Sequence, residues 1–235
     1  MRRFPRTSLS TAGVVLALMM GQLALVSWAS PAAACASHCY GRARWPNPDA
    51  PSNHGAYGVL NVDCLKVNNT DYFVDDELWV ANAGGASWVE EGMAYGAPRT
   101  DRYWFWADDR PNWPYAEHDR PDLSVALNAD YSVTLEYAGS DGNWDVFRNG
   151  TSIGATSTDN FNPPSVWLAA GSETTADSPH IGARVKDLLW KQTNDAWNAD
   201  WNETPHPALQ AQDDYTTNWA VQWQSVHMTA NTGAC

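Results

Sequence analysis

Short segments in which apolar and polar residues alternate run through most of the chain. Residues 131–137 (YSVTLEY) alternate strictly, so one face of this segment is apolar and the other is polar. A period of two is typical of a β-strand with one buried face. Similar segments, rich in Val, Tyr, Trp and Thr and bounded by turn residues, predict strands at 57–62, 71–74, 77–81, 87–93, 102–107, 131–137, 144–147, 152–156, 164–170, 181–190 and 218–228.

The turns between these segments favour antiparallel pairing. A Gly-Ser-Asp-Gly turn at 139–142 follows the segment at 131–137, and Asn149-Gly150 forms a strong hairpin signal shortly afterwards. No segment shows a sustained helical period with caps, and residues 187–198 are the best helical candidate. Many short strands without helices between them predict an all-β fold, an antiparallel β-sandwich or jelly roll.

The N-terminal residues have the layout of a secretory signal peptide. Three arginines among the first six residues precede an uncharged apolar run at 12–26, and small residues follow at 32–34. The run is short for a membrane span, so we expect a cleaved signal peptide over 1–34 and a secreted, extracellular protein. A lipoprotein cleaved before Cys35 is the alternative. The rest is expected to form an N-terminal coil at 35–56 and one sandwich domain at 57–235.

Four cysteines fit export to an oxidising compartment. Cys35, Cys39, Cys64 and Cys235 form an even set, so two disulfides are expected. Three lie near the predicted mature N-terminus and one is the last residue. We therefore expect at least one bridge to connect the C-terminus to the N-terminal coil. A metal site that uses Cys35, His38 and Cys39 is the less favoured interpretation.

Net charge and aromatic content restrict the classes of molecule that the protein is expected to bind. The 235-residue chain has 14 Lys and Arg against 27 Asp and Glu, a net charge of −13, and this acidity argues against nucleic acid as a partner. Its 44% hydrophobic content is sufficient for a core. The 14 tryptophans are more than a core alone requires, so we expect some of them at a binding surface.

The strand at 102–107 carries aromatic side chains on both faces. Tyr103 and Phe105 point one way, while Trp104 and Trp106 point the other, and one buried face accounts for only one of these pairs. The leading hypothesis is a Trp-rich groove that binds a carbohydrate or cell-wall polymer, because indole rings stack on sugars and polar groups contact hydroxyls. Its predicted ligand-binding residues are Trp104, Trp106, Trp113, Tyr115, Asp108, Asp109, Glu117 and His118. The competing interpretation is that these tryptophans fill the core.

An enzyme of the same fold, either a divergent acid peptidase or a glycan hydrolase or lyase, is the second hypothesis. Acid–base catalysis needs two carboxyl groups with separated pKa values, and Glu90 or Glu91 together with Glu173 are the candidates. Because Glu90 and Glu91 are adjacent on a strand, only one of them can face a groove. A third hypothesis is a secreted toxin, inhibitor or assembly component that binds a protein partner.

Other chemistries find little support in the sequence. It contains no Gly-x-Ser-x-Gly nucleophile elbow, no His-Glu-x-x-His motif and no phosphate-binding glycine loop. No loop shows a specific pattern of metal ligands. We therefore expect neither a metal nor another cofactor.

The order of several motifs resembles the eqolisin family of glutamic endopeptidases, which are concanavalin-like β-sandwiches. Leu78-Trp79-Val80 is similar to the family's opening Trp-Val strand, and the segment 87–92 (SWVEEG) is similar to the strand that carries its catalytic Gln. The aromatic segment at 103–109 resembles a third family strand. The resemblance covers residues 77–173 and implies a jelly-roll fold and an acid peptidase ancestry.

The catalytic positions of that family are not preserved. Glu90 stands where the family has Gln, and Val166 precedes Trp167 where the family has its catalytic Glu. Valine cannot act as an acid or a base. Glu173 lies further along the chain and would need a different geometry to replace it. The resemblance thus implies the fold rather than an inherited peptidase mechanism.

Overall fold

The computed structural model describes most of the chain after residue 37. It covers residues 38–45, 53–69, 71–82, 85–111, 113–139, 142–156, 167–176 and 179–198, and the backbone of 210–213, 218–222 and 225–230. These residues form strands, turns and connecting segments without a helix, which confirms the all-β prediction. Within them, no helix is long and apolar enough to cross a membrane.

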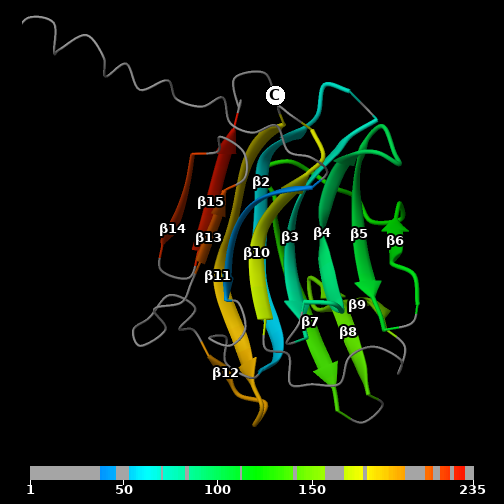
Figure 1. Ribbon diagram of the computed structural model, residues 1–235, viewed down its shortest axis with the longest axis vertical. Coiled ribbons are helices and arrows are strands. Elements are labelled where there is room, and N and C mark those ends of the chain that lie inside the picture. The colour runs from blue at the N-terminus through cyan, green and yellow to red at the C-terminus, as the bar shows by residue number, and fades with distance from the viewer. Residues whose placement is uncertain are drawn as a thin grey trace, which may run out of the picture. The chain divides into compact units, whose positions relative to one another are not determined.

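Two antiparallel sheets face each other (Figure 1). The first sheet has the order β13 (Gln210–Asp213), β1 (Cys39–Trp45), β10 (Trp167–Thr174), β3 (Phe73–Ala81), β4 (Trp88–Gly96), β5 (Arg102–Asp109) and β6 (Ala116–Arg120). The second has the order β14 (Asn218–Gln222), β15 (Ser225–Ala230), β11 (His180–Gln192), β2 (Asn53–Lys66), β7 (Asp130–Ala138), β8 (Asn143–Arg148) and β9 (Thr151–Ala155). The two-residue strand β12 (Trp197–Asn198) also pairs with β11.

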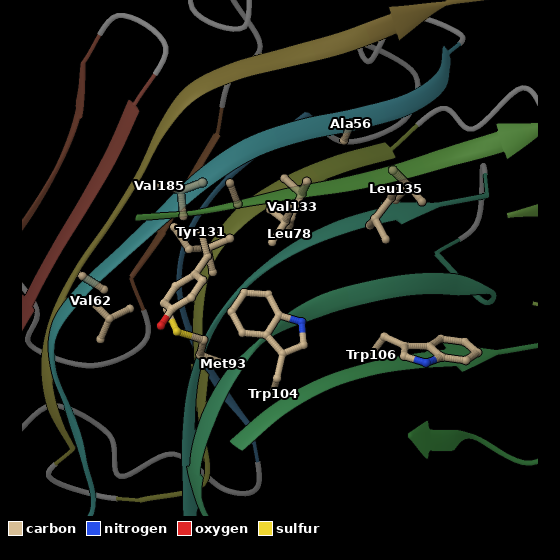
Figure 2. Close-up of a cluster of buried hydrophobic side chains, with 14 of the residues drawn as sticks. Ala56, Val62, Leu78, Met93, Trp104, Trp106, Tyr131, Val133, Leu135 and Val185 are labelled. Atoms are coloured by element: carbon tan, nitrogen blue, oxygen red, sulfur yellow. The ribbon is translucent and has the colours of Figure 1, made fainter. Parts of the chain in front are cut away.

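The core lies between the sheets and follows the alternation read from the sequence. The apolar residues of 131–137 point into it, so Val133 and Leu135 are fully buried. Across from them, Leu78 of β3 and Met93 of β4 come from the first sheet, and Trp104 of β5 lies among them (Figure 2). Burial of these side chains supplies the main stabilising free energy of the sandwich.

Two carboxyl groups lie in this apolar core. Asp76 of β3 is fully buried, and neither of its carboxyl oxygens has a hydrogen-bond partner among the described residues. Glu91 of β4 is also fully buried, and the indole N–H of Trp104 donates to its Oε1 at 3.2 Å. Burial raises the pKa of both carboxyl groups well above their usual range, so both are expected to be neutral in the fold.

Gly92 sets the contact between β3 and β4. A Cβ atom added at this residue would lie 2.4 Å from the carbonyl oxygen of Asp76 and 2.9 Å from the Cα atom of Glu77. Both are backbone atoms of the neighbouring strand, so they cannot move without disturbing the sheet. The position therefore requires glycine for close approach rather than for an unusual backbone angle.

One turn behaves as predicted. Asn149 and Gly150 have φ values of 50° and 71° and connect β8 to β9 as a hairpin. Positive φ at both positions is what a two-residue hairpin with Asn-Gly requires.

Several sequence predictions of local structure were wrong. Residues 39–45, expected as coil, form β1 because they pair with β10 on one side and β13 on the other. The segment at 116–120, expected as a loop, pairs with β5 as β6. Residues 71–74 and 77–81, expected as two strands, fall largely in one continuous strand, β3.

The predicted helical candidate at 187–198 is also wrong. The segment continues β11 after a bulge, where Asp187 adopts a φ of 55°, and it then turns back to form β12. Residues 218–222 and 225–230, expected as parts of one strand, are the two strands β14 and β15, which pair with each other.

Only two of the four cysteines in the disulfide prediction lie among the described residues. Cys39 and Cys64 are buried, and neither is a free cysteine. Cys35, Cys235 and the predicted signal peptide at 1–34 lie outside the part of the chain that the structure describes. The pairing of the cysteines therefore stays a prediction.

Candidate functional site

A groove of about 910 Å³ lies on the face of the first sheet that points away from the core. Alternation on each strand decides which side chains reach it, so residues that neighbour core positions in sequence line the groove. Its lining includes His38, Tyr40, Arg42, Asp75, Trp79, Trp88, Glu90, Tyr103, Phe105, Tyr115, Glu117, Trp167 and Glu173. We refer to this surface as the groove.

Glu90 is the buried acid of the groove. Its side chain points from β4 to the opposite side from Glu91, and the residue is only 6% exposed. Burial raises the pKa of Glu90 to about 8, and the negative charge of Glu173 adds to this effect. Hydrogen bonds from Tyr115 and Trp79 act in the opposite direction. Glu90 is therefore expected to be a neutral carboxylic acid at neutral and acid pH.

Glu173 of β10 is the second carboxyl group of the groove. The ring Nδ1 of His38 is hydrogen-bonded to its Oε1. This bond raises the pKa of His38 against the opposing effect of its partial burial. The backbone N–H of Glu173 donates to Oδ1 of Asp75 at 2.7 Å, which ties the strand locally to β3.

Two further carboxyl groups lie beside this pair. Asp75 and Glu77 are buried, and burial raises the pKa of each well above its usual range. The negative charge of Glu173 raises the pKa of Asp75 further. This concentration of acids in one place makes simultaneous ionisation unfavourable, so most of them must hold a proton.

Arg42 supplies positive charge on the β1 side of the groove. Its guanidinium carbon lies 3.7 Å from the ring centre of Tyr40. The ring centres of Trp79 and Trp167 are further away, at 5.1 Å and 5.0 Å. Burial lowers the pKa of Arg42, while the negative charges of Glu173 and Glu77 act to raise it. The stacked guanidinium is thus a fixed cation beside the acids.

The structure separates the sequence-predicted ligand residues into two groups. Tyr115 and Glu117 line the groove. Trp104 and Trp106 do not, because their face of β5 points into the core, where they are 0% and 6% exposed. Tyr103 and Phe105 occupy the groove instead. The prediction that strand β5 has one aromatic face in the core and one in a groove is right, but the assignment of the faces was reversed.

The remaining candidates lie away from the groove. Asp108 is buried on the core side of β5, 2.9 Å from Nε of Arg110 and 3.6 Å from Nε2 of His118. His118 stacks on Trp106, with ring centres 3.9 Å apart. Asp109 ends β5 outside the lining. Trp113 is 52% exposed but is likewise not part of the lining.

The catalytic candidates separate in the same way. Glu90 and Glu173 are brought together in the groove, whereas Glu91 points into the core. The sequence assigned none of His38, Arg42 and Asp75 to a groove, and His38 was considered only as a metal ligand. Asp75 could have been found from its position in an alternating strand, because it shares a face with Trp79. His38 and Arg42 come from the segment that composition predicted as coil, so no pattern indicated their direction.

The described residues contain no group of three or more His, Cys, Asp or Glu side chains arranged to hold a metal ion. Of the acids in the groove, Glu173 is hydrogen-bonded to His38, and Glu90 is hydrogen-bonded to Tyr115 and Trp79. The groove thus offers carboxyl groups, an imidazole and aromatic hydroxyl and indole groups.

Comparison with known proteins supports the fold. No protein-family model and no curated protein sequence matches the chain. Among solved structures, scytalido-glutamic peptidase with a transition state analogue inhibitor has a TM-score of 0.58 at 12% identity, covering 83% of this chain and 98% of that one. The eqolisin SCP-B in complex with the tripeptide Ala-Ile-His has a TM-score of 0.53 at 10% identity, with the same coverage.

A tetrameric galectin from the sponge Cinachyrella is more distant, with a TM-score of 0.42 at 14% identity, covering 63% of this chain and 96% of the galectin. The likeness to the two peptidases confirms the sequence-based resemblance at the level of the fold. The chain has the jelly-roll sandwich of the eqolisins, built on a sequence that shares little with theirs.

Proposed function

We propose that this protein is a carboxyl-dependent hydrolase that cleaves a polypeptide held in the groove. The observation that carries the proposal is the pair formed by Glu90 and Glu173. One is a buried acid with a raised pKa, and the other is hydrogen-bonded to His38, whose pKa is also raised. A buried neutral carboxylic acid and a second carboxyl group hydrogen-bonded to an imidazole are a pair of the kind that acid–base catalysis needs.

The pair gives a balanced reaction sequence. Glu173 accepts a proton from a water molecule, and the water oxygen attacks the carbonyl carbon of the substrate. Neutral Glu90 donates a hydrogen bond to the carbonyl oxygen as negative charge develops there, and its proton then passes to the leaving amine as the C–N bond breaks. The new carboxyl group and the amine leave, Glu173 releases to solvent the proton that it took from water, and Glu90 must regain a proton before the next cycle.

A polypeptide is the substrate class that the observations favour. Two solved peptidases share the fold, and each is described with a peptide-like or peptide ligand. The groove combines aromatic walls with a few placed polar groups, which suits an extended chain. Because Glu90 ionises above its pKa of about 8, activity is expected from acid to neutral pH and to fall on the alkaline side.

Carbohydrate binding in the same groove is the second candidate. The rings of Trp88 and Tyr115 lie 6.2 Å apart at the groove, with an angle of 34° between their planes. Such a pair can stack on the apolar face of a sugar. Binding alone, however, gives no reason for buried carboxyl groups in the groove, whereas hydrolysis uses them.

Incubation of the purified protein with a denatured polypeptide, followed by mass spectrometry of new chain ends, tests the proposal. We expect cleavage by the wild type, and a loss of about 10² to 10⁴ in turnover for Glu173→Gln. Glu90→Gln retains a hydrogen-bond donor but no transferable proton, so it should lose turnover and also the alkaline limb of the pH profile. Asp71→Asn, at an exposed carboxyl outside the groove, is the matched control.

Two results would overturn the assignment. Full turnover by both glutamine variants would remove Glu90 and Glu173 from the reaction. The absence of new chain ends, combined with depletion of the protein on cellulose, chitin or cell wall, would instead favour the carbohydrate-binding function.

A further inference from the structure

A chain of hydrogen bonds connects Glu90 with the edge of the first sheet. The hydroxyl group of Tyr115 lies 3.1 Å from Oε1 of Glu90 and 3.3 Å from Oε2 of Glu117. Glu117 in turn shares a hydrogen bond with Asp119, two residues along β6. β6 is the last strand of its sheet, and Glu117 is exposed there. The chain thus runs from a buried acid to a group in contact with solvent.

This route matters because Glu90 has little direct access to water. The residue is 6% exposed, and a substrate in the groove would cover the opening through which water could reach it. Tyr115, by contrast, is 46% exposed, and it lines the groove together with Glu117 of β6. A proton that enters at Glu117, at the edge of the sheet, can reach Glu90 along the side chains of the groove wall rather than through the space in which the substrate lies.

We propose that Tyr115 and Glu117 form a proton relay that returns a proton from solvent to Glu90 while the groove is occupied. The inference rests on the proposed hydrolase function. In the transfer, the Tyr115 O–H bond breaks as its proton moves to the Glu90 carboxylate, and the proton of the Glu117 carboxylic acid moves to the Tyr115 oxygen. Glu117 then takes a proton from water or from Asp119. One proton enters from solvent for each one that Glu90 gives to a leaving amine.

The electrostatics of the chain are consistent with this transfer. Glu117 is exposed as a residue, but partial desolvation of its carboxyl group beside the groove raises its pKa to about 7. This is close to the value of about 8 for Glu90, so a proton can move between them with little preference for either. Asp119 raises the pKa of Glu117 further, while hydrogen bonds from Tyr103 and Tyr115 act against the rise.

Ionisation of Tyr115 is unfavourable in the fold. Burial raises the pKa of its hydroxyl above the usual value, and the negative charges of Glu90, Glu117 and Glu77 add to this effect. The relay therefore moves the two protons together, which the geometry allows because the hydroxyl is within hydrogen-bond distance of both carboxyl groups.

A purely positional role for Tyr115 would give different kinetics. If the hydroxyl group only holds the Glu90 side chain, its removal changes the reactive geometry, and no added acid can compensate. If it carries a proton, its removal leaves proton delivery as the slow step, which small carboxylic acids in the buffer can take over. The solvent isotope effect and the buffer dependence of turnover therefore separate the two roles.

The experiment compares wild type, Tyr115→Phe and Glu117→Gln, with Tyr57→Phe on the second sheet as the matched control. We expect about a tenfold or larger fall in kcat for the first two variants. Turnover should be restored by formate or acetate, with a larger solvent isotope effect than in the wild type. Unchanged kcat, or a fall that no buffer acid restores, would overturn the relay. Either result would leave the hydrolase proposal standing if Glu173→Gln is inactive.

A second measurement does not depend on turnover. A rapid pH jump from alkaline to acid, followed by the infrared carbonyl band that is lost in Glu90→Gln, reports how fast Glu90 gains its proton. With an inert peptide saturating the groove, the relay predicts slower protonation in Tyr115→Phe and in Glu117→Gln than in the wild type or Tyr57→Phe. Equal rates in all four proteins would refute the relay even if no substrate is found.

Discussion

Replacing Asp76 with asparagine tests how the sandwich tolerates acids in its core. Asp76 is fully buried between the sheets, and burial raises the pKa of its carboxyl group well above the usual range. In the unfolded chain this pKa is about 3.9. Above that pH the unfolded state releases the proton while the folded state keeps it, so the free energy of unfolding falls as pH rises.

The size of the effect follows from linkage. A group that is protonated in the folded state and ionised in the unfolded state changes the free energy of unfolding by about 1.4 kcal/mol for each pH unit. The loss begins near pH 3.9 and continues until the folded-state pKa is reached; below pH 3.9 both states hold the proton and Asp76 contributes no pH dependence. The asparagine side chain does not titrate, so Asp76→Asn should lack this part of the slope.

Asparagine also introduces a constant cost. Its amide N–H groups would lie in the same apolar space without partners, at about 1–3 kcal/mol at every pH. The prediction therefore concerns how the free energy of unfolding changes with pH, and not the constant difference between the two proteins. In acid Asp76→Asn should be less stable than the wild type, and the difference should shrink or reverse as pH approaches neutrality.

Urea unfolding followed by tryptophan fluorescence, repeated in steps from acid to neutral pH, measures this difference. Asp71→Asn, at an exposed carboxyl, serves as the control and should run parallel to the wild type. If the curves of the wild type and Asp76→Asn also ran parallel, Asp76 would not be a neutral acid in the core, and the reasoning from its burial would be wrong.

Two more predictions concern packing and the groove. Gly154→Ala would place a Cβ atom 2.4 Å from the buried ring of Trp106, so we expect a loss of about 1–3 kcal/mol in urea unfolding; unchanged stability would mean that β9 can move away from the core. His38→Gln removes the cationic partner of Glu173, so turnover should fall at acid pH and converge with the wild type once His38 is neutral, as pH–rate profiles would show. A constant ratio across pH would contradict that role.

The fold was largely predictable because most of its strands alternate clearly between apolar and polar residues. Residues 131–137 and the hairpin at Asn149-Gly150 were predicted and are confirmed, since one face of each strand is buried and the turn has an unambiguous sequence. The strand at 39–45 was not predictable in this way. In its sequence Tyr40, Arg42 and Arg44 alternate with Cys39, Ala43 and Trp45, and pairing with β10 decides its conformation.

The site was only half predictable for a related reason. Alternation states that Glu90 and Glu91 face opposite sides, but it does not say which side is the core. On β5 the aromatic residues are similar on both faces, so nothing local distinguishes Trp104 from Phe105. The sandwich makes the choice by packing the larger indole rings against the second sheet. The partnership of Glu90 with Glu173 depends on sheet order, which no local pattern encodes.

The close approach at Gly92 helps to fix the register of β4, and the register decides which glutamate faces the groove. A slip of β4 by one residue would carry Glu91 to the groove and Glu90 to the core, and it would also turn Val89 and Met93 out of the core. The same slip would bring a side chain to the position that Gly92 occupies, against the backbone of Asp76 and Glu77. The two adjacent glutamates do not themselves define the register, so the apolar residues beside them and the missing side chain of Gly92 together decide which glutamate becomes the acid.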